Sequence, residues 1–187
     1  MAATANTAVS LSESYYLRSF YKNNRNAATD NKRKEMSAGT LSQADAQALR
    51  TSVRKLRNFN YEEDTTDGAN IYSSVSAFLE TYNHALESSG GSGDYSLKRY
   101  AKQLKNLAKE YADELKDVGI TVNSDGTLEK NENLLKAAKV TKIDKLFGKD
   151  AEFTTKSSRY AKQINAIASD LIYTELTQTG THINLSI

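Results

Sequence analysis

Residues 97–118 read LKRYAKQLKNLAKEYADELKDV, and the apolar positions in this stretch are separated alternately by four and three residues. Those positions are Leu97, Ala101, Leu104, Ala108, Tyr111, Leu115 and Val118. Heptad spacing of this kind places them on one face of a helix. The alternation of leucine with alanine favours close approach of a partner helix. We therefore predict one long helix from Leu97 to Val118 as the spine of the fold.

The partner of this helix is predicted directly before it. The segment Ala69–Leu86, which contains SVSAFLETYNHAL (74–86), repeats the heptad spacing at Ile71, Val75, Phe78, Tyr82 and Ala85. Ser88–Gly93 (SSGGSG) follows, and its composition is typical of a tight turn or small linker. Two amphipathic helices with so short a connection pack best antiparallel, as a helical hairpin.

The periodicity changes after the spine, in GITVNSDGTLE (119–129). Ile120, Val122 and Leu128 flank the sequence Asn123-Ser124-Asp125-Gly126. A turn with Asp-Gly between β-branched and apolar residues is typical of a β-hairpin. We therefore predict a hairpin over Gly119–Glu129.

Further helices are predicted after the hairpin. Glu129–Leu146 holds enough apolar residues for one or two short helices, and Phe153–Thr177 repeats the four-three-four spacing. The tail GTHINLSI (180–187) is predicted to be either a terminal strand or disordered. Three tyrosines lie on the apolar faces of the predicted helices, and we expect them in the core with their hydroxyls at its edge. They are Tyr82, Tyr111 and Tyr160.

For the N-terminal part of the chain, the sequence predicts less regular structure. Residues 1–10 are small and polar and are predicted to be disordered. Residues Leu11–Tyr21 are predicted to form a short helix. Lys22–Gly39 is polar and predicts a loop, or a weak helix that ends at Gly39.

A clearer helix is predicted from Thr40 to Asn58. Thr40 is its expected cap, because Gln43 stands at the capping-box spacing. The apolar face of this helix consists of Leu49, Val53 and Leu56. Tyr61–Gly68 (YEEDTTDG) is an acidic connector to the heptad segments.

Composition supports a chain made mostly of helices. The 187 residues include no proline, a residue that breaks helix interiors. The hydrophobic content is 39% and the mean hydropathy is −0.63, values that fit a slim bundle whose helices largely face water. We predict a mainly α fold, an antiparallel helical bundle with coiled-coil-like seams and one small β-hairpin. Residues 11–187 are expected to form one helical domain, with basic helices over 11–60 and a core over 69–176.

Several classes of site and location are excluded or disfavoured by composition. The chain has no cysteine and only two histidines, His84 and His182, which excludes disulfides, thiolate sites and a His-rich metal site. No apolar run approaches the ~20 residues of a membrane span. The start MAATANTAVSLSES lacks the basic and apolar regions of a secretory signal peptide. We expect no cofactor, no small-molecule substrate and no membrane partner.

The segment Thr121–Glu132 is the one candidate calcium loop. Four residues match EF-hand positions 3, 5, 6 and 12, and they are Asn123, Asp125, Gly126 and Glu132. Position 1 is Thr121, a poor calcium ligand, and the flanks fit strands as well as helices. We favour the hairpin over the calcium site.

An acidic stripe near the end of the spine is the candidate for acid–base chemistry. It consists of Glu110, Asp113, Glu114 and Asp117. No nucleophile, histidine or phosphate-binding loop accompanies it. We therefore predict a solvated stripe that pairs with Lys109 and Lys116, and no catalytic residue.

Two other features carry no predicted chemistry. His84 lies on a helix flank and is expected to be a surface histidine. Gly90-Gly91-Ser92-Gly93 lacks the lysine and the strand context of a P-loop.

Positive charge and aromatic residues gather near the N-terminus. Residues 1–60 carry ten Lys and Arg against four Asp and Glu, whereas 61–187 carry fifteen against nineteen. The aromatic residues Tyr15, Tyr16, Phe20 and Tyr21 stand near Arg18, Lys22 and Arg25. Such a cluster can stack on single-stranded nucleic acid, or it can be an amphipathic helix docked on the bundle or on another subunit. We favour docking.

The segment from Ala69 to about Ala168 resembles the C-terminal helical domain of the flagellar filament cap protein, hook-associated protein 2. A phrase of the type V-x-x-F-[VL]-x-x-Y-N is matched by Val75, Phe78, Leu79, Tyr82 and Asn83. A long helix follows, and then G-I-T-x-x-x-D-G-x-L is matched by Gly119, Ile120, Thr121, Asp125, Gly126 and Leu128. The final matches are Asn133-Leu134-Leu135 with Ala137 and Ala138, and Leu146-Phe147.

The resemblance implies a self-associating structural protein, exported by the flagellar type III route without a cleaved signal peptide. The chain is too short for the outer domains of cap proteins, so it resembles a stripped helical core, a distant relative or a repurposed descendant of them. The function that we expect is therefore non-enzymatic assembly by helix packing, with another copy or a flagellin-like subunit as partner. The alternatives are a cytoplasmic helical binding module, of adaptor or chaperone type, and a nucleic-acid-associated protein that uses the basic segment 1–60.

Overall fold

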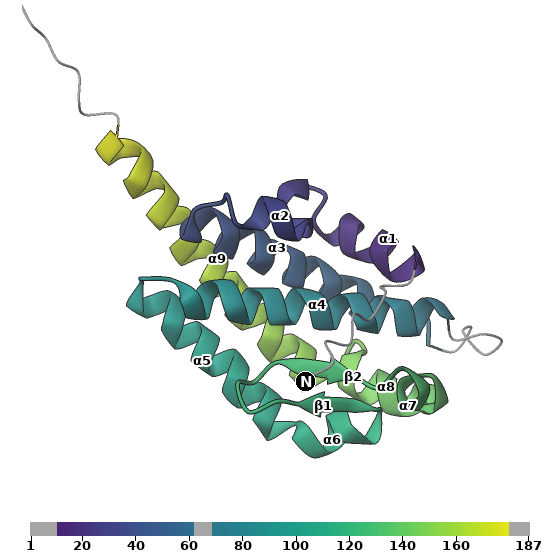
Figure 1. Cartoon of the computed structure of the whole chain (residues 1–187). Helices are drawn as coiled ribbons and strands as arrows, with labels where there is room; N and C mark the ends of the chain where they lie inside the picture. Colours follow the sequence, from purple (N-terminus) through teal and green to yellow (C-terminus); the bar gives the residue numbers. More distant parts are fainter. Residues whose placement is uncertain (1–10, 62–68, 180–187) are drawn as a thin grey trace, which may run out of the picture.

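The computed structural model describes residues 11–61 and 69–179 and confirms a mainly α fold with one small hairpin (Figure 1). The expectations for residues 1–10, 180–187 and most of the acidic connector lie outside the described residues. The elements are α1 (Leu11–Phe20), the 3₁₀-helix η1 (Arg25–Ala28), α2 (Asp30–Arg33), α3 (Ala38–Arg57), α4 (Ala69–Gly91), α5 (Tyr95–Glu110), α6 (Ala112–Asp117), β1 (Ile120–Val122), β2 (Leu128–Lys130), α7 (Glu132–Ala137), α8 (Val140–Phe147) and α9 (Glu152–Thr179).

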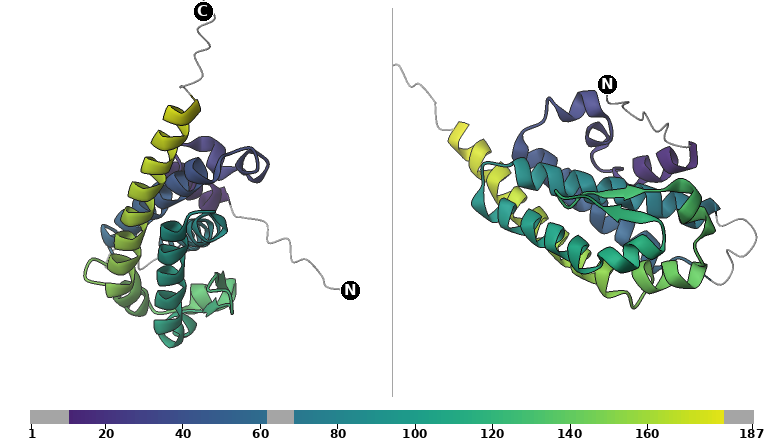
Figure 2. Two further views of the ribbon diagram at one scale, coloured as in Figure 1. Left: turned by 90° about the vertical axis from the view of Figure 1, so that its left-hand side faces the viewer. Right: turned by 60° about the horizontal axis from the view of Figure 1, so that its bottom comes forward.

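Helix α3 is the centre of the bundle and packs most extensively on α9 and α4. Near its start, the Gln43 amide donates to the Ser169 hydroxyl at 2.8 Å. At its other end, Arg57 Nε donates to the carbonyl of Lys149, just before α9, at 3.0 Å. The two helices are therefore antiparallel (Figure 2). The core that we expect over 69–176 thus also includes α3.

Helices α4 and α5 form the predicted antiparallel pair. Tyr82 lies in the core as expected, but its hydroxyl is buried and not at the edge of the core, and it donates its hydrogen to the carbonyl of Leu104. The prediction of one continuous spine from Leu97 to Val118 is wrong, because the backbone leaves the helical range at Tyr111. The Tyr111 side chain is only partly buried, and its hydroxyl donates to the Glu152 carboxylate of α9 at 3.0 Å. The break lets α6 turn and pack against β1 and α8.

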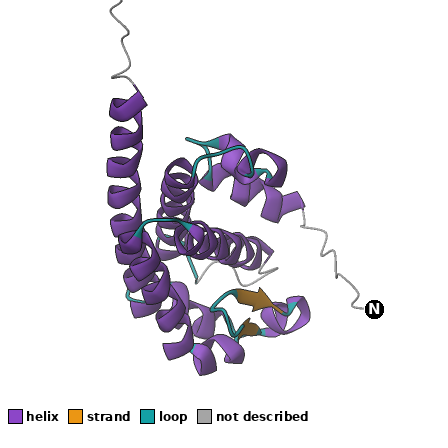
Figure 3. Cartoon of the chain, turned by 60° about the vertical axis from the view of Figure 1, so that its left-hand side comes forward, coloured by secondary structure: helices purple, strands orange, loops and turns teal. Residues whose placement is uncertain are grey.

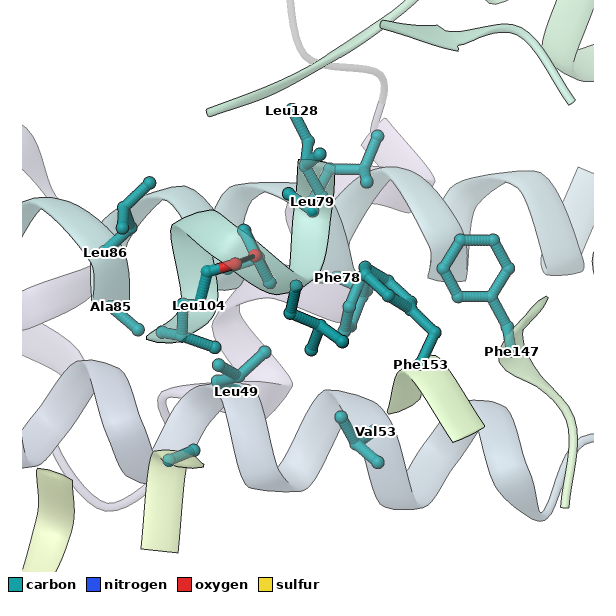
Figure 4. Close-up of a cluster of buried hydrophobic side chains, with 14 of the residues drawn as sticks. Leu49, Val53, Phe78, Leu79, Ala85, Leu86, Leu104, Leu128, Phe147 and Phe153 are labelled. Atoms are coloured by element: carbon teal, nitrogen blue, oxygen red, sulfur yellow. Dashed lines mark hydrogen bonds between the residues drawn. The ribbon is translucent and has the colours of Figure 1, made fainter. Parts of the chain in front are cut away.

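Aromatic side chains fill the part of the core where α4, α8 and α9 meet (Figure 4). Phe78, Phe147 and Phe153 are fully buried, and the Phe78–Phe147 ring centroids lie 5.4 Å apart in an edge-on arrangement. Phe153 lies 6.1 Å from Phe78 and stacks on Tyr82 at 6.1 Å. Aromatic pairs at such distances add stability beyond the area that they bury.

The predicted hairpin is confirmed (Figure 3), and its strand β2 packs against α4. Strands β1 and β2 pair antiparallel, with Thr121 opposite Glu129. Gly126 adopts a φ of +93° in the turn, a value that favours glycine. The Asn83 amide accepts from the N–H of Leu128 at 2.8 Å and donates to its carbonyl at 2.9 Å. Asn83 therefore acts on β2 as a neighbouring strand would.

The start of α3 differs from the prediction. Ser37, not Thr40, is its cap, because the Ser37 hydroxyl accepts from the Thr40 N–H at 3.3 Å. Gly39 does not end a helix but lies buried in the first turn of α3. A Cβ there would lie 3.3 Å from Ile172 of α9, so glycine allows the two helices to approach closely.

The connection between α4 and α5 is shorter than predicted. The expected turn Ser88–Gly93 is helical as far as Gly91. Ser89 is fully buried, and its hydroxyl donates to the Ala85 carbonyl. Packing against the bundle therefore keeps this Gly/Ser segment helical. Asp94 caps the next helix by accepting from the Leu97 N–H at 2.8 Å.

Candidate interaction surfaces

The aromatic and basic N-terminal segment docks on the bundle, as we favoured. Helix α1 packs on α4 and α3, and Phe20 and Tyr21 are buried with 5% and 1% of their surface exposed. Lys55 lies over the Tyr16 ring at 5.7 Å. Tyr15 stays exposed. Because Phe20 and Tyr21 are covered, these two rings are not available to stack on bases.

A buried polar network lies under the N-terminal segment. The Arg33 guanidinium donates to both carboxylate oxygens of Asp45, at 2.7 and 2.9 Å, and to the carbonyl of Ala27 at 2.7 Å. Asp45 has no exposed surface and Arg33 has 8%. Tyr21 donates its hydroxyl hydrogen to Asp45 at 2.7 Å. These bonds connect α1, η1 and α2 to α3.

His84 belongs to this network, so the prediction of a surface histidine is wrong. Its Nδ1 lies 2.9 Å from the Tyr21 hydroxyl. The single hydroxyl hydrogen is directed to Asp45, and we therefore assign the hydrogen of the second bond to His84 Nδ1. Burial lowers the pKa of His84, and the nearby Arg33 lowers it further. A carboxylate within the alanine-rich face of α3 is the sequence signal that could have revealed the network.

The shifted pKa of His84 predicts a pH dependence of stability. Because the folded pKa is lowered, the unfolded chain binds a proton first as pH falls below about 6.5, and the folded state loses stability. His84→Asn keeps a nitrogen donor near Nδ1 but does not titrate. We expect the melting temperature of the natural chain to fall relative to this variant between pH 7.5 and the lowered pKa. Parallel melting curves of the two proteins over this range would contradict the assignment.

The residues of the candidate calcium loop are divided among different elements. Thr121 lies in β1, whereas Glu132 opens α7. The Asp125 carboxylate accepts from the Thr127 N–H at 2.9 Å and from its hydroxyl at 2.7 Å. Among residues 11–61 and 69–179, no group of three or more His, Asp or Glu side chains is placed to hold a metal ion.

The acidic stripe forms its ion pairs with other partners than predicted. Glu110 pairs with Lys156 of α9 at 2.9 Å, and Asp117 pairs with Lys142 of α8 at 2.7 Å. The predicted partners, Lys109 and Lys116, do not form these pairs. Asp113 and Glu114 are exposed. The stripe therefore connects α5 and α6 to the neighbouring helices and does not converge on a site.

The last turns of α9 present an exposed surface that the sequence did not single out. They extend past the neighbouring helices at one end of the bundle (Figures 1 and 3). Every side chain from Tyr173 to Gln178 is exposed. Tyr173 and Leu176, three residues apart and so on one side of the helix, are 71% and 65% exposed. We call these two residues the α9 surface.

Comparison with known proteins leaves the family open. No protein-family model, curated protein or solved structure gives a significant match to the chain. Within the part of the chain that the structure describes, no helix is long and apolar enough to cross a membrane.

Proposed function

We propose that this chain is a non-enzymatic structural or assembly protein that acts through helix packing and associates with further copies of itself. The α9 surface is the observation that carries the proposal. Tyr173 and Leu176 are large, exposed and on one side of a helix that extends past the bundle. Covering apolar side chains in a contact between copies is favourable, at roughly 25 cal/mol for each Å² removed from water.

The resemblance to the filament cap core supports a role for this assembly in the flagellum. The phrases that carry the resemblance lie in α4, in the hairpin region and in the short helices α7 and α8 with the residues that flank them. On this proposal the protein acts in the flagellum, outside the cell, after export without a cleaved signal peptide. An adaptor or chaperone-like binding module in the cytoplasm is the alternative.

Self-association can be measured by size-exclusion chromatography with light scattering over a wide range of concentrations. We expect a mass above that of the monomer at high concentration. Tyr173→Ser combined with Leu176→Ser is expected to shift the protein to monomer, because it removes the apolar part of the contact.

The matched control changes Tyr15 and Leu134 to serine, since both are exposed and lie on other elements. This control should associate like the natural chain. A natural chain that stays monomeric at high concentration, or a control as defective as the α9 variant, would contradict the proposal.

A further inference from the structure

A basic groove runs along α3 beside α9. Its volume is about 780 Å³. Five cationic side chains line it, namely Lys22, Arg50, Arg54, Arg57 and Lys149. Within the described residues, none of them forms an ion pair and no carboxylate lines the groove. Among the described residues, the positive charge of the groove therefore has no carboxylate partner.

The three arginines form a row along one face of α3. Their spacings of four and three residues place them about 6 and 4.5 Å apart along the helix axis. The bond from Arg57 Nε to the Lys149 carbonyl holds one end of the row in place. Guanidinium groups bind carboxylate and phosphate oxygens in a forked geometry. Such a row suits a ligand with several anionic groups in line.

The remaining lining favours a peptide over a nucleic acid. No aromatic side chain of the described residues lines the groove, so bases would find no stacking partner. Asn165 lines it, and its Oδ1 is buried without a hydrogen-bond partner. A buried acceptor without a hydrogen-bond partner is unfavourable, so the amide gains by turning toward a donor. A peptide backbone supplies N–H donors, whereas a phosphodiester backbone has only acceptors.

We propose that this groove binds an extended acidic segment of a partner protein. Side chains on one side of an extended chain repeat about every 6.6 Å, close to the spacing of Arg50 and Arg54. Carboxylates bind the arginine row, and the peptide backbone lies over Asn165. The surface is separate from the α9 surface, so either proposal can fail without the other.

Fluorescence anisotropy of a labelled octaglutamate peptide, titrated with the full chain, tests the proposal. We expect saturable binding that Arg50→Gln combined with Arg54→Gln weakens by about tenfold or more. Arg99→Gln with Arg159→Gln removes the same charge elsewhere and should change the affinity by less than about twofold. All four arginines are exposed, so both variants should keep the natural melting temperature. Lys149→Glu, on the other wall, should weaken binding independently.

Three outcomes would overturn the proposal. Absence of binding at low salt excludes an acidic peptide as the occupant. Equal weakening in both double variants means that only the net charge attracts the peptide. Tighter binding of single-stranded DNA of equal charge, lost in the groove variants, would assign the groove to nucleic acid.

Discussion

Asp45→Ala is expected to lower the free energy of unfolding by about 3–5 kcal/mol, the range for breaking one side of a buried ion pair. The carboxylate is fully buried and receives hydrogen bonds from Arg33 and Tyr21. Its removal leaves the Arg33 guanidinium buried without a counter-charge and the Tyr21 hydroxyl without an acceptor. Urea unfolding followed by circular dichroism measures the loss.

The control for this variant is Asp117→Ala, which removes the carboxylate of the exposed pair with Lys142. Exposed pairs contribute little because water and salt screen them, so its unfolding midpoint should match that of the natural chain. A second variant, Asp45→Leu with Arg33→Met, removes both charges and should be more stable than Asp45→Ala. An Asp45→Ala protein that unfolds with the natural midpoint would mean that the network adds no stability.

Sequence periodicity predicted the elements whose stability depends on a continuous apolar face. The three-four spacing of Val75, Phe78 and Tyr82 correctly indicated α4, and these residues are fully buried. The change of period at Ile120, with Asp-Gly in the turn, correctly indicated the hairpin. In both cases the deciding interactions are local or repeat along one element, so the pattern contains the required information.

The remaining features depend on contacts between distant segments. Tyr111 keeps the heptad spacing, yet the helix breaks there and its hydroxyl bonds to α9. His84 has an ordinary helical context, and only the docking of α1 brings Tyr21 against it. The arginine row of α3 was visible only as net charge. Its arrangement as a groove depends on α9 and on Lys149.

Phe153→Ala is expected to lower the free energy of unfolding by about 3–5 kcal/mol, as large-to-small changes of buried aromatic residues do. Phe153 has no exposed surface. Its ring lies 5.5 Å from Tyr111 and 6.0 Å from Phe147, in addition to its contacts with α4. Rings from several elements surround it, so the cavity cannot close by the movement of one side chain. Urea unfolding measures the loss.

Tyr173→Ala is the matched control for Phe153→Ala, because it removes an aromatic ring from the same helix at an exposed position. At protein concentrations low enough to keep the chain monomeric, the control should retain the natural unfolding midpoint, since its ring is not part of the core. At high concentration the same variant should associate less, if the proposed role of the α9 surface is correct. Equal destabilisation by the two variants at low concentration would refute the view that the core ends before Tyr173. Loss of an exposed ring cannot create a cavity. Equal destabilisation would therefore mean that the end of α9 unfolds cooperatively with the core.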